Sequence, residues 1–496
     1  MPISSQPVFA AGDVPTATQL NAWMTQIKAA FNEGGSTGLT TDDFRWPMKA
    51  GGHINMGGNA ILGVPRFGST YNLTNRPPWA SAQMVLDEVE ARGGASVLLM
   101  GNTTQPSQTG KDGLPSIKPG SNTHVLGHGH TSILGGIYAK GKQQLFFNDL
   151  QMNGANQLID CDHVTFLRVN FTGTGAYQLN LKNCSFVTFI DCRFTGAATV
   201  QLKAEGFRSL VVTACEFVDC ADYYAQFYIA DGTSFDDLQF QYNILRHPST
   251  YTPGDRVAVF LGDQSFSWND QLQGWHLSLR GNLIGSGGPG GLYASGVQNL
   301  DISFNLQLDA THTVKGSWLK EVGDTVLLGN IIKSSDYGVM VGDTNLYPDG
   351  GVTLAYDYIL AADESYVWRN PHYSGSALSW PILSAEYTQL VMGCYMETAD
   401  AALPVAAIWR LGGTDTRYIC NAQIYGNLFN PQGGNDGYRT FRSDSEASPG
   451  ASIGGSATVR NWFVFVGNTS PNTNTTNTDL VDNTTTNKVV FLDNNV

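Results

Sequence analysis

Two stretches of the sequence combine aromatic rings with acidic side chains, and they are the first places to look for chemistry. Residues 246–276 and 333–390 hold tyrosines and tryptophans together with aspartates. A ring can cover the apolar face of a pyranose, and a carboxylate can accept hydrogen bonds from sugar hydroxyls. These residue types suit sugar binding, while the alternative is that the rings pack loops onto the scaffold or onto a neighbouring subunit. The candidate sugar contacts are Tyr251, Trp268, Trp275, Trp368 and Trp380.

Acidic residues are the candidates for sugar cleavage. Hydrolysis of a glycosidic bond requires two carboxyl groups about 5.5 Å apart for retention or roughly 6.5–9.5 Å apart for inversion. The chain holds 42 acidic residues, so chance clusters are expected. No distinctive motif is formed by any of the three clusters, which are Asp219-Asp222, Asp231-Asp236-Asp237 and Asp263-Asp270. Whether the protein is an enzyme therefore stays open. The candidate catalytic residues are Asp231, Asp263 and Asp270.

Other chemistries find less support in the sequence. A lyase needs a base and a cation to hold a substrate carboxylate, and His247, His276 and Arg256 are available, but their spacing indicates nothing. His128 and His130 can bind a metal from one side of a strand, yet they fit a polar turn better. Neither a Walker loop nor a nucleophile elbow is present. The sequence predicts no metal site and no cofactor.

These side chains need a scaffold, and an internal repeat predicts one. An apolar-x-apolar-x-x-apolar-x-apolar template recurs along the chain, with a step of 23 residues where it is best matched. Alternation on both sides of a two-residue offset describes two short strands that meet at a corner, with alternate side chains facing one interior. The first copies are Leu145-Phe147-Leu150-Met152, Val164-Phe166-Val169-Phe171, Val187-Phe189-Cys192-Phe194 and Leu210-Val212-Cys215-Phe217.

Further along the chain, the third template position becomes asparagine, often preceded by glycine. Both residues tolerate turn conformations that others resist, and stacked asparagines can hydrogen-bond along a column. A Gly-Asn pair therefore suits the corner between the two strands. The asparagine copies are Leu238-Phe240-Asn243-Leu245, Leu277-Leu279-Asn282-Ile284, Leu300-Ile302-Asn305-Gln307, Thr325-Leu327-Asn330-Ile332, Ala422-Ile424-Asn427-Phe429, Phe463-Phe465-Asn468-Ser470 and Val489-Phe491-Asn494-Val496.

Stacked copies of this unit predict an all-β fold, a right-handed parallel β-helix. Each coil pairs with its neighbours at about 4.8 Å, and parallel crossovers are right-handed by default. The template also predicts a surface ion pair between Arg193 and Glu216, because both are outward and share a column. Some cysteines share inward columns, where packed reduced thiols are a better interpretation than disulfides. The stacked pairs are Cys161 with Cys184 and Cys192 with Cys215.

Composition narrows the functional classes. The chain has 496 residues, a formal net charge of −14, 14% charged residues and 56 glycines, which favours strands and turns. An acidic surface repels phosphate backbones and anionic lipid, so we expect no nucleic-acid partner. No secretory signal and no apolar run near the roughly 18 residues of a membrane span is present. The sequence predicts synthesis in the cytoplasm and no membrane insertion.

Two helices are expected before the solenoid. Residues 16–33 carry apolar residues at helical spacing and present an apolar stripe that needs a partner. A second helix spans about Trp79 to Arg92 and stops at Gly93-Gly94. A helix at that position can cover the open edge of the first coil, which would otherwise pair with other chains.

Three segments resemble known families. "FAAGDVPTATQLNAW" at 9–23 and "HINMGGNAILGV" at 53–64 are similar to the N-terminal attachment region of bacteriophage tail fibres and tailspikes. "AQMVLDEVEARGGASVLLM" at 82–100 resembles the beginning of the pectate-lyase-type β-helix of many tailspikes. The resemblance implies a virion-attachment region at 1–64, a capping helix and the start of the solenoid at 65–120, and a β-helix at 121–496 with loop excursions at 246–276 and 333–390.

The same resemblance implies a tailspike-like receptor-binding protein of a phage virion that recognises a host surface polysaccharide. Cleavage of that polysaccharide, by a glycoside hydrolase or lyase activity, stays open. The expected partners are the protein itself as a homotrimer, another virion protein through residues 1–64, and the polysaccharide. One alternative is a non-catalytic structural fibre, adaptor or decoration spike of the virion. Another is a free polysaccharide lyase or hydrolase, which the attachment motif disfavours.

Overall fold

The computed structural model describes the unit Ile61–Val496 from Arg66 to Asn494, with gaps. Residues 1–65 lie outside the described residues, so the helix expected at 16–33 and the attachment region stay predictions. The gaps are 68–69, 74–81, 100, 104–116, 174–175, 197–198, 230–232, 248–256, 263–273, 286–289, 309–315, 321, 336, 342–350, 363–364, 370–387, 400–405, 411–420, 432–440, 446–461, 471–487 and 493.

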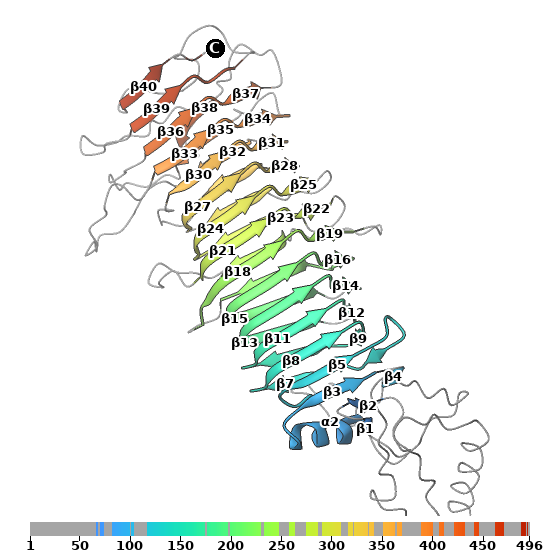
Figure 1. Ribbon diagram of the computed structural model, residues 1–496. Helices are drawn as coiled ribbons and strands as arrows, with labels where there is room; N and C mark the ends of the chain where they lie inside the picture. Colours follow the sequence, from blue (N-terminus) through green and yellow to red (C-terminus); the bar gives the residue numbers. More distant parts are fainter. Residues whose placement is uncertain are drawn as a thin grey trace, which may run out of the picture. The chain divides into compact units, whose positions relative to one another are not determined.

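The helix α2, Ala82–Ala91, covers the first coil (Figure 1). Its apolar face is buried against β2 (Thr70–Asn72) and β5 (Thr123–Leu126). The backbone N–H of Gly94, which has a φ of +106°, donates to Val89 O at 2.8 Å and ends the helix. The helix expected in this stretch, with its glycine stop, is confirmed. No helix in the described part of the chain is long and apolar enough to cross a membrane.

The body is a right-handed parallel β-helix, as the repeat predicts. Each complete coil has a strand on each of three faces, and strands of one face pair in parallel from coil to coil (Figure 1). The antiparallel exception is β1, Arg66–Phe67, which pairs with β2. The first-face strands are β7 (Tyr138–Lys140), β10 (Asn156–Ile159), β17 (Tyr223–Tyr228), β20 (Val257–Gly262), β23 (Gly290–Ser295), β26 (Ser317–Lys320), β29 (Val339–Val341), β32 (Tyr366–Arg369), β35 (Ala406–Arg410) and β38 (Phe441–Ser445).

The other two faces meet at the corner that the template describes. Strands β13 (Tyr177–Ile190) and β15 (Val200–Thr213) run over both the first and the second face. The other second-face strands are β2, β3 (Ala95–Leu98), β5, β8 (Gln143–Asn148), β11 (Asp162–Leu167), β18 (Phe235–Gln241), β21 (Gly274–Arg280), β24 (Gln298–Ser303), β27 (Gly323–Leu328), β30 (Val352–Ala355), β33 (Thr388–Met392), β36 (Asn421–Tyr425), β39 (Trp462–Val466) and β40 (Lys488–Leu492). The third-face strands are β4 (Asn102–Thr103), β6 (Ile133–Leu134), β9 (Gln151–Asn153), β12 (Asn170–Thr172), β14 (Arg193–Thr195), β16 (Glu216–Val218), β19 (Ile244–Arg246), β22 (Leu283–Ile284), β25 (Leu306–Leu308), β28 (Ile331–Ser334), β31 (Tyr358–Ala361), β34 (Tyr395–Thr398) and β37 (Leu428–Pro431).

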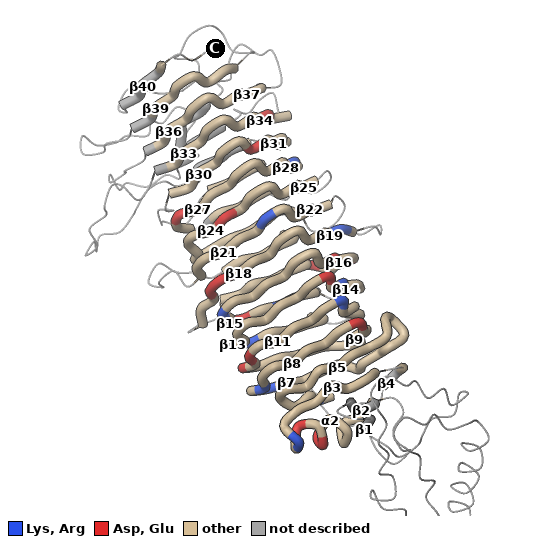
Figure 2. Tube along the Cα trace, viewed as in Figure 1, with Lys and Arg blue, Asp and Glu red and all other residues tan. Residues whose placement is uncertain are grey.

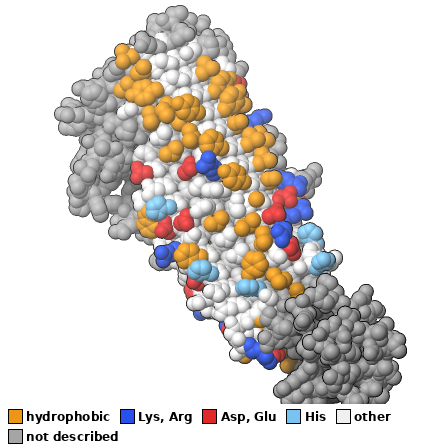
Figure 3. Space-filling model, viewed as in Figure 1, with side chains coloured by type: hydrophobic (Ala, Val, Ile, Leu, Met, Phe, Trp, Pro, Cys, Tyr) orange, Lys and Arg blue, Asp and Glu red, His pale blue; other side chains and the backbone are white. Residues whose placement is uncertain are grey.

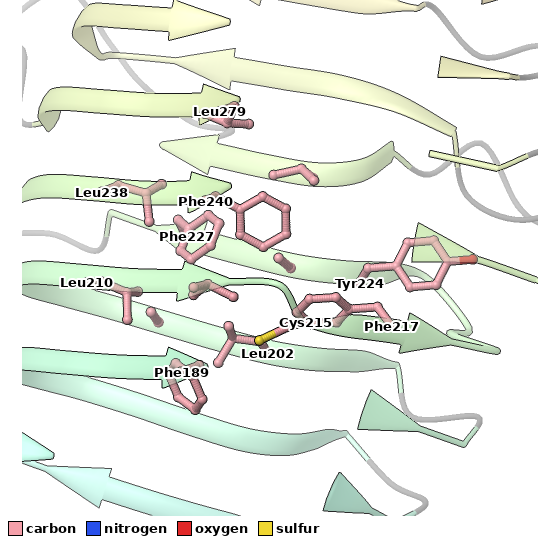
Figure 4. Packing of buried hydrophobic residues seen from close by; sticks show 14 of the residues in the cluster. Phe189, Leu202, Leu210, Cys215, Phe217, Tyr224, Phe227, Leu238, Phe240 and Leu279 are labelled. Atoms are coloured by element: carbon pink, nitrogen blue, oxygen red, sulfur yellow. The ribbon is translucent and has the colours of Figure 1, made fainter. Parts of the chain in front are cut away.

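Apolar side chains fill the interior in stacked columns. Phe171, Phe194 and Phe217 share one register position in successive third-face strands, and all three are fully buried. Their ring centroids lie 4.6 Å apart in both steps. Second-face residues such as Phe189 and Phe240 complete the same interior (Figure 4). The alternation of the template therefore marks inward-facing residues.

The corner between the second and third faces contains two ladders of residues. At the first ladder position the backbone is left-handed, with φ of +65° at Gly281 and +63° at Gly329. The next position is the template asparagine, whose side chain is buried. Asn282 Nδ2 donates to Asn305 Oδ1 of the following coil and to Phe240 O of the preceding coil, both at 2.9 Å. The predicted Gly-Asn corner and its hydrogen-bonded column are confirmed.

Two further coils use the template without asparagine, and the sequence repeat missed them. Asp357 and Cys394 take the asparagine position, and both are buried at the corner. Their backbone pairing continues that of the neighbouring coils, so the stack is not interrupted. The two missed copies are Val352-Leu354-Asp357-Ile359 and Gln389-Val391-Cys394-Met396.

Solenoid strands lie within the loop excursions predicted at 246–276 and 333–390. The first stretch contains β20 and the start of β21, and the second contains β29 to β32 and the start of β33. The template describes only the second and third faces, so it has no position for a first-face strand. Several first-face strands are also buried on both sides, as β23 is at all six positions. Burial on both sides removes the period-two alternation by which strands are recognised.

The described cysteines are free and buried, in agreement with the predicted thiol columns. Charged residues are sparse along the coils and are separated by long uncharged runs (Figure 2). The expected ion pair is confirmed, with Arg193 Nε 2.8 Å from Glu216 Oε2, and Arg246 of the next coil contacts the same carboxylate. The described outer surface of the solenoid is therefore mainly uncharged.

Candidate functional site

Most of the site residues predicted from sequence have no described side chain. Trp368 lies in β32, which is described by its backbone alone, and Trp275 lies in β21 with its side chain half-buried. The other residues stay predictions that the structure does not test. The residues outside the described part of the chain are Asp231, Tyr251, Asp263, Trp268, Asp270 and Trp380.

Trp275 lies beside two other residues that the sequence analysis singles out. Parallel pairing of β18 with β21 places Asp236 in register with Trp275. The next residue, His276, has a φ of +54°, so the strand bends there and the imidazole projects outward. Its Nδ1 lies 2.8 Å from Asp236 Oδ1. Two neighbouring coils thus place Trp275 in register with Asp236, whose carboxylate is hydrogen-bonded to the adjacent His276.

A second carboxylate lies beside this group. Asp237 also has a left-handed backbone, with a φ of +53°, and occupies the coil before His276 in the same column. Ser209 Oγ donates to Asp237 Oδ2 at 2.7 Å, and Gln239 Nε2 donates to Asp237 Oδ1 at 3.3 Å. These two hydrogen bonds fix the carboxylate on the outer surface. We call Ser209, Asp236, Asp237, Trp275 and His276 the His276 ridge.

The chemistry available to the His276 ridge follows from its hydrogen bonds and exposure. When Nδ1 of His276 donates to Asp236, its Nε2 carries the lone pair that can accept a proton or a hydroxyl hydrogen bond. The two side chains are 68% and 48% exposed. Catalytic acids and bases are usually groups whose pKa is shifted by burial and neighbours. The open position of this pair therefore favours recognition of a polar ligand over acid–base catalysis.

A cluster of tyrosines and a carboxylate lies on the third face. Tyr358 and Tyr395 stack in successive coils, with ring centroids 4.5 Å apart. The Tyr395 hydroxyl donates to Glu397, and Asn430 Nδ2 donates to both the hydroxyl, at 2.9 Å, and Glu397 Oε2, at 3.0 Å. Burial and the bond to Glu397 raise the pKa of Tyr395. The sequence analysis missed this group because it lies in a coil where Cys394 replaces the asparagine of the template.

The remaining histidine candidates divide between the interior and the surface. His247 is almost fully buried at the end of β19, and its Nδ1 lies 3.6 Å from Asp219 Oδ1. Burial lowers the pKa of His247, and the charge of Asp219 acts against that shift. His128 and His130 are exposed and form an isolated parallel bridge. No three His, Cys, Asp or Glu side chains in the described coils are grouped as metal ligands would be.

Comparison with known proteins shows no family and a distant structural likeness. The sequence matches no family model and no curated protein. A mannuronic acid specific polysaccharide family 6 lyase from human gut microbiota is 10% identical, with a TM-score of 0.38 over 80% of this chain and 86% of that chain. A variant of the tailspike protein of E. coli bacteriophage HK620, in complex with a hexasaccharide, is 12% identical, with a TM-score of 0.32 over 88% and 77%.

A protein of a different kind is similar to the same degree. The surface protein and adhesin PfbA of Streptococcus pneumoniae is 10% identical, with a TM-score of 0.35 over 84% of this chain and 94% of that chain. At these identities the likeness can concern only the fold, and at these TM-scores it carries no argument about this chain. The function has to be argued from the residues of this chain.

Proposed function

We propose that this protein is a tailspike-like receptor-binding protein of a bacteriophage virion that recognises a surface polysaccharide of the bacterial host. The attachment-type motifs at 9–23 and 53–64 support the virion role. One observation carries the polysaccharide role: Trp275 is in register with Asp236, and the exposed side chains of Asp236 and His276 are hydrogen-bonded on the outer surface of the stacked strands. A half-buried ring next to fixed polar groups suits a sugar, which has one apolar face and a rim of hydroxyls.

The test measures binding and cleavage in the same experiment. Purified protein is incubated with capsule or lipopolysaccharide from candidate hosts, and bound polymer, reducing ends and unsaturated products are measured. Trp275→Ala and His276→Ala should each weaken binding about tenfold, as is usual for residues at the centre of a binding site. Products that His276→Ala abolishes would add catalysis to recognition. Absence of both binding and products contradicts the proposal and favours a structural fibre, adaptor or decoration spike.

The chain offers a matched control for this test. His163 Nδ1 lies 2.8 Å from Asp162 Oδ2, and His163 occupies an earlier coil of the same left-handed column as His276. The stacking partner of His163 is Phe186, which lies in the same column, and no tryptophan contacts the pair in the described structure. His163→Ala should therefore leave binding unchanged. Equal loss in His163→Ala and His276→Ala would indicate a general effect on charge or folding.

Self-association belongs to the same proposal, as a homotrimer on the virion. The outward column of the third face is apolar over successive coils from β19 to β37, and Figure 3 shows hydrophobic side chains gathered over this part of the surface. Large exposed apolar surfaces of soluble proteins usually mark interfaces. Residues 1–64 are proposed to dock on another virion protein. The column residues are Ile244, Leu283, Leu306, Ile331, Tyr358, Tyr395 and Leu428.

A further inference from the structure

Three aromatic side chains occupy corner positions where glycine is the natural choice. Tyr242, Phe304 and Tyr356 have φ of +56°, +56° and +58°, in the ladder that holds Gly281 and Gly329. A left-handed backbone is unfavourable for residues with a Cβ, and more so for bulky ones. The three rings are also 57%, 51% and 64% exposed, so burial does not explain them. Neither backbone preference nor core packing accounts for these aromatic residues.

Each of these rings lies across a glycine of the following coil. A Cβ added at that glycine would meet the same edge of the ring, formed by Cδ1 and Cε1, in all three places. The glycines therefore leave room for the rings, and the rings share one orientation on the surface. The distances from such a Cβ to the ring Cδ1 are 2.6 Å for Gly281 and Tyr242, 3.0 Å for Gly329 and Phe304, and 2.7 Å for Gly393 and Tyr356.

Ring and glycine alternate strictly along this part of the corner. Main-chain hydrogen bonds link the corner residues to the following coil, from Tyr242 N to Arg280 O and from Phe304 N to Leu328 O, at 2.8 Å each. One ring therefore occurs in every second coil. Because adjacent coils are about 4.8 Å apart, successive rings are about 9.6 Å apart along the stack. We call Tyr242, Phe304 and Tyr356 the aromatic row.

Polar side chains border the aromatic row on the second face. Gln241 and Arg280 share a column next to the corner, in the coil of the first ring and the coil of the glycine that follows it, whereas Ser303 continues the column but is buried. The Arg280 guanidinium lies 5.2 Å from the centroid of the Phe304 ring. Hydrogen-bond donors and acceptors thus lie within reach of a ligand that stacks on the rings. A sugar has this combination of an apolar face and polar edges.

We propose that the aromatic row is a binding track for an extended polysaccharide that lies parallel to the solenoid axis. In a ribbon-like β-1,4-linked chain each sugar is turned over relative to its neighbour, so only every second sugar presents the same face. The length of two such sugars is close to the two-coil spacing of the rings. One ring would then stack on every second sugar. This inference rests on the proposed function and names the substrate class and a second surface, separate from the His276 ridge.

Ligand length provides a sharp test. One sugar stacks on one ring, three sugars reach two rings, and five sugars reach from Tyr242 to Tyr356, which are four coils apart. Affinity for cello-oligosaccharides should therefore rise at the trimer and again at the pentamer, with smaller changes at the dimer and tetramer. Each added ring should strengthen binding about threefold to tenfold. A smooth increase with length, or no binding of cellohexaose, would overturn the track.

Ring substitutions test the location of the track. Phe304→Ala should weaken cellohexaose binding about tenfold and remove the step at the trimer. The matched control is Phe186→Ala, because Phe186 is also exposed and left-handed, with a φ of +52°, but lies at the other corner of the coil. It should leave binding unchanged. Maltohexaose, whose α-linked chain is coiled rather than ribbon-like, should bind weakly. Equal binding of cellohexaose by wild type and Phe304→Ala would show that the aromatic row is not the binding site.

Binding measurements with host polysaccharide distinguish an error in the binding track from an error in the proposed function. Loss of host-polymer binding in Trp275→Ala but not in Phe304→Ala would overturn the row and retain the proposed function. Stepwise cello-oligosaccharide binding that depends on Phe304, without binding of any host polymer, would support the row and contradict the proposed function. An altered oligomeric state of Phe304→Ala with unchanged sugar binding would assign the row to a contact between copies of the chain and overturn the proposal.

Discussion

At the residue scale, Asp357 replaces asparagine in the corner column. Its ionised carboxylate lacks the N–H group that the asparagine amide donates. Asn330 N and Nδ2 donate to Asp357 Oδ1 at 2.7 and 2.8 Å. Asn330 Nδ2 also donates to Ile302 O, and by the same pattern Leu327 O is the carbonyl next to Asp357 Oδ2. A protonated Oδ2 can donate to that carbonyl, whereas an ionised one cannot. Burial raises the pKa of Asp357 to about 6.

This buried carboxyl should make stability depend on pH. Its pKa is raised on folding, so its stabilising effect is complete below about pH 4 and is lost as the pH rises to about 6. The shift from 3.8 to about 6 corresponds to about 3 kcal/mol. Asp357→Asn should therefore raise the melting temperature at pH 7, and the advantage should shrink towards pH 4. Thermal unfolding of both proteins at several pH values checks this, and an equal difference at pH 4 and 7 contradicts it.

Spacing in the sequence predicts the interior residues better than the site. Phe171 and Phe194 follow from a constant step between adjacent coils, because no insertion intervenes. The contact between Asp236 and His276 spans 40 residues, and it depends on the register that β18 and β21 adopt after segments of unequal length. Trp275 is recognisable as a ring next to acidic residues. Its neighbours in space are not recognisable from spacing.

At the element scale, stacked phenylalanines hold the third face to the second. Phe194 contacts rings in the coils on both sides and is fully buried. Phe194→Ala should lower the free energy of unfolding by about 3–5 kcal/mol, because it removes transfer energy and leaves a cavity. Phe186→Ala removes an exposed ring from the same coil and should cost less than about 1 kcal/mol. Thermal unfolding compares the two, and similar losses would contradict the columnar core.

The three kinds of strand differ in how well the sequence predicts them. Second- and third-face strands have one side inward and one side outward, so alternation marks them, and the corner fixes their relative position. First-face strands such as β20 and β23 are buried on both sides over much of their length. Their outward aromatic residues, among them Phe260 and Tyr293, form a separate buried cluster. Burial of both sides explains why the repeat accounts for two strands of each coil and misses the third.

At the scale of the whole molecule, the third-face column should control assembly. Ile331 is 46% exposed in the middle of the column, where its neighbours in both directions are apolar. Wild type should sediment as three copies of 53.5 kDa, and Ile331→Lys should dissociate, because a buried unpaired charge is costly. Ile190→Lys places the same charge on the second face and should leave the trimer intact. A monomeric wild type would contradict the assembly. Equal dissociation by the two lysine substitutions would show that the third-face column is not the specific interface.

The equal 23-residue steps from Phe166 to Phe189 and from Phe189 to Val212 have an evolutionary consequence. Excision or duplication of one whole step would join strands that already share a register. Within a strand, a change of one residue more or less would turn interior side chains towards water, whereas the unequal segments between later coils show that the loops absorb insertions. Selection can therefore lengthen or shorten the solenoid by whole coils without redesigning its cross-section. The length of the solenoid and its cross-section can then evolve independently, because each added coil repeats the packing of the coil before it.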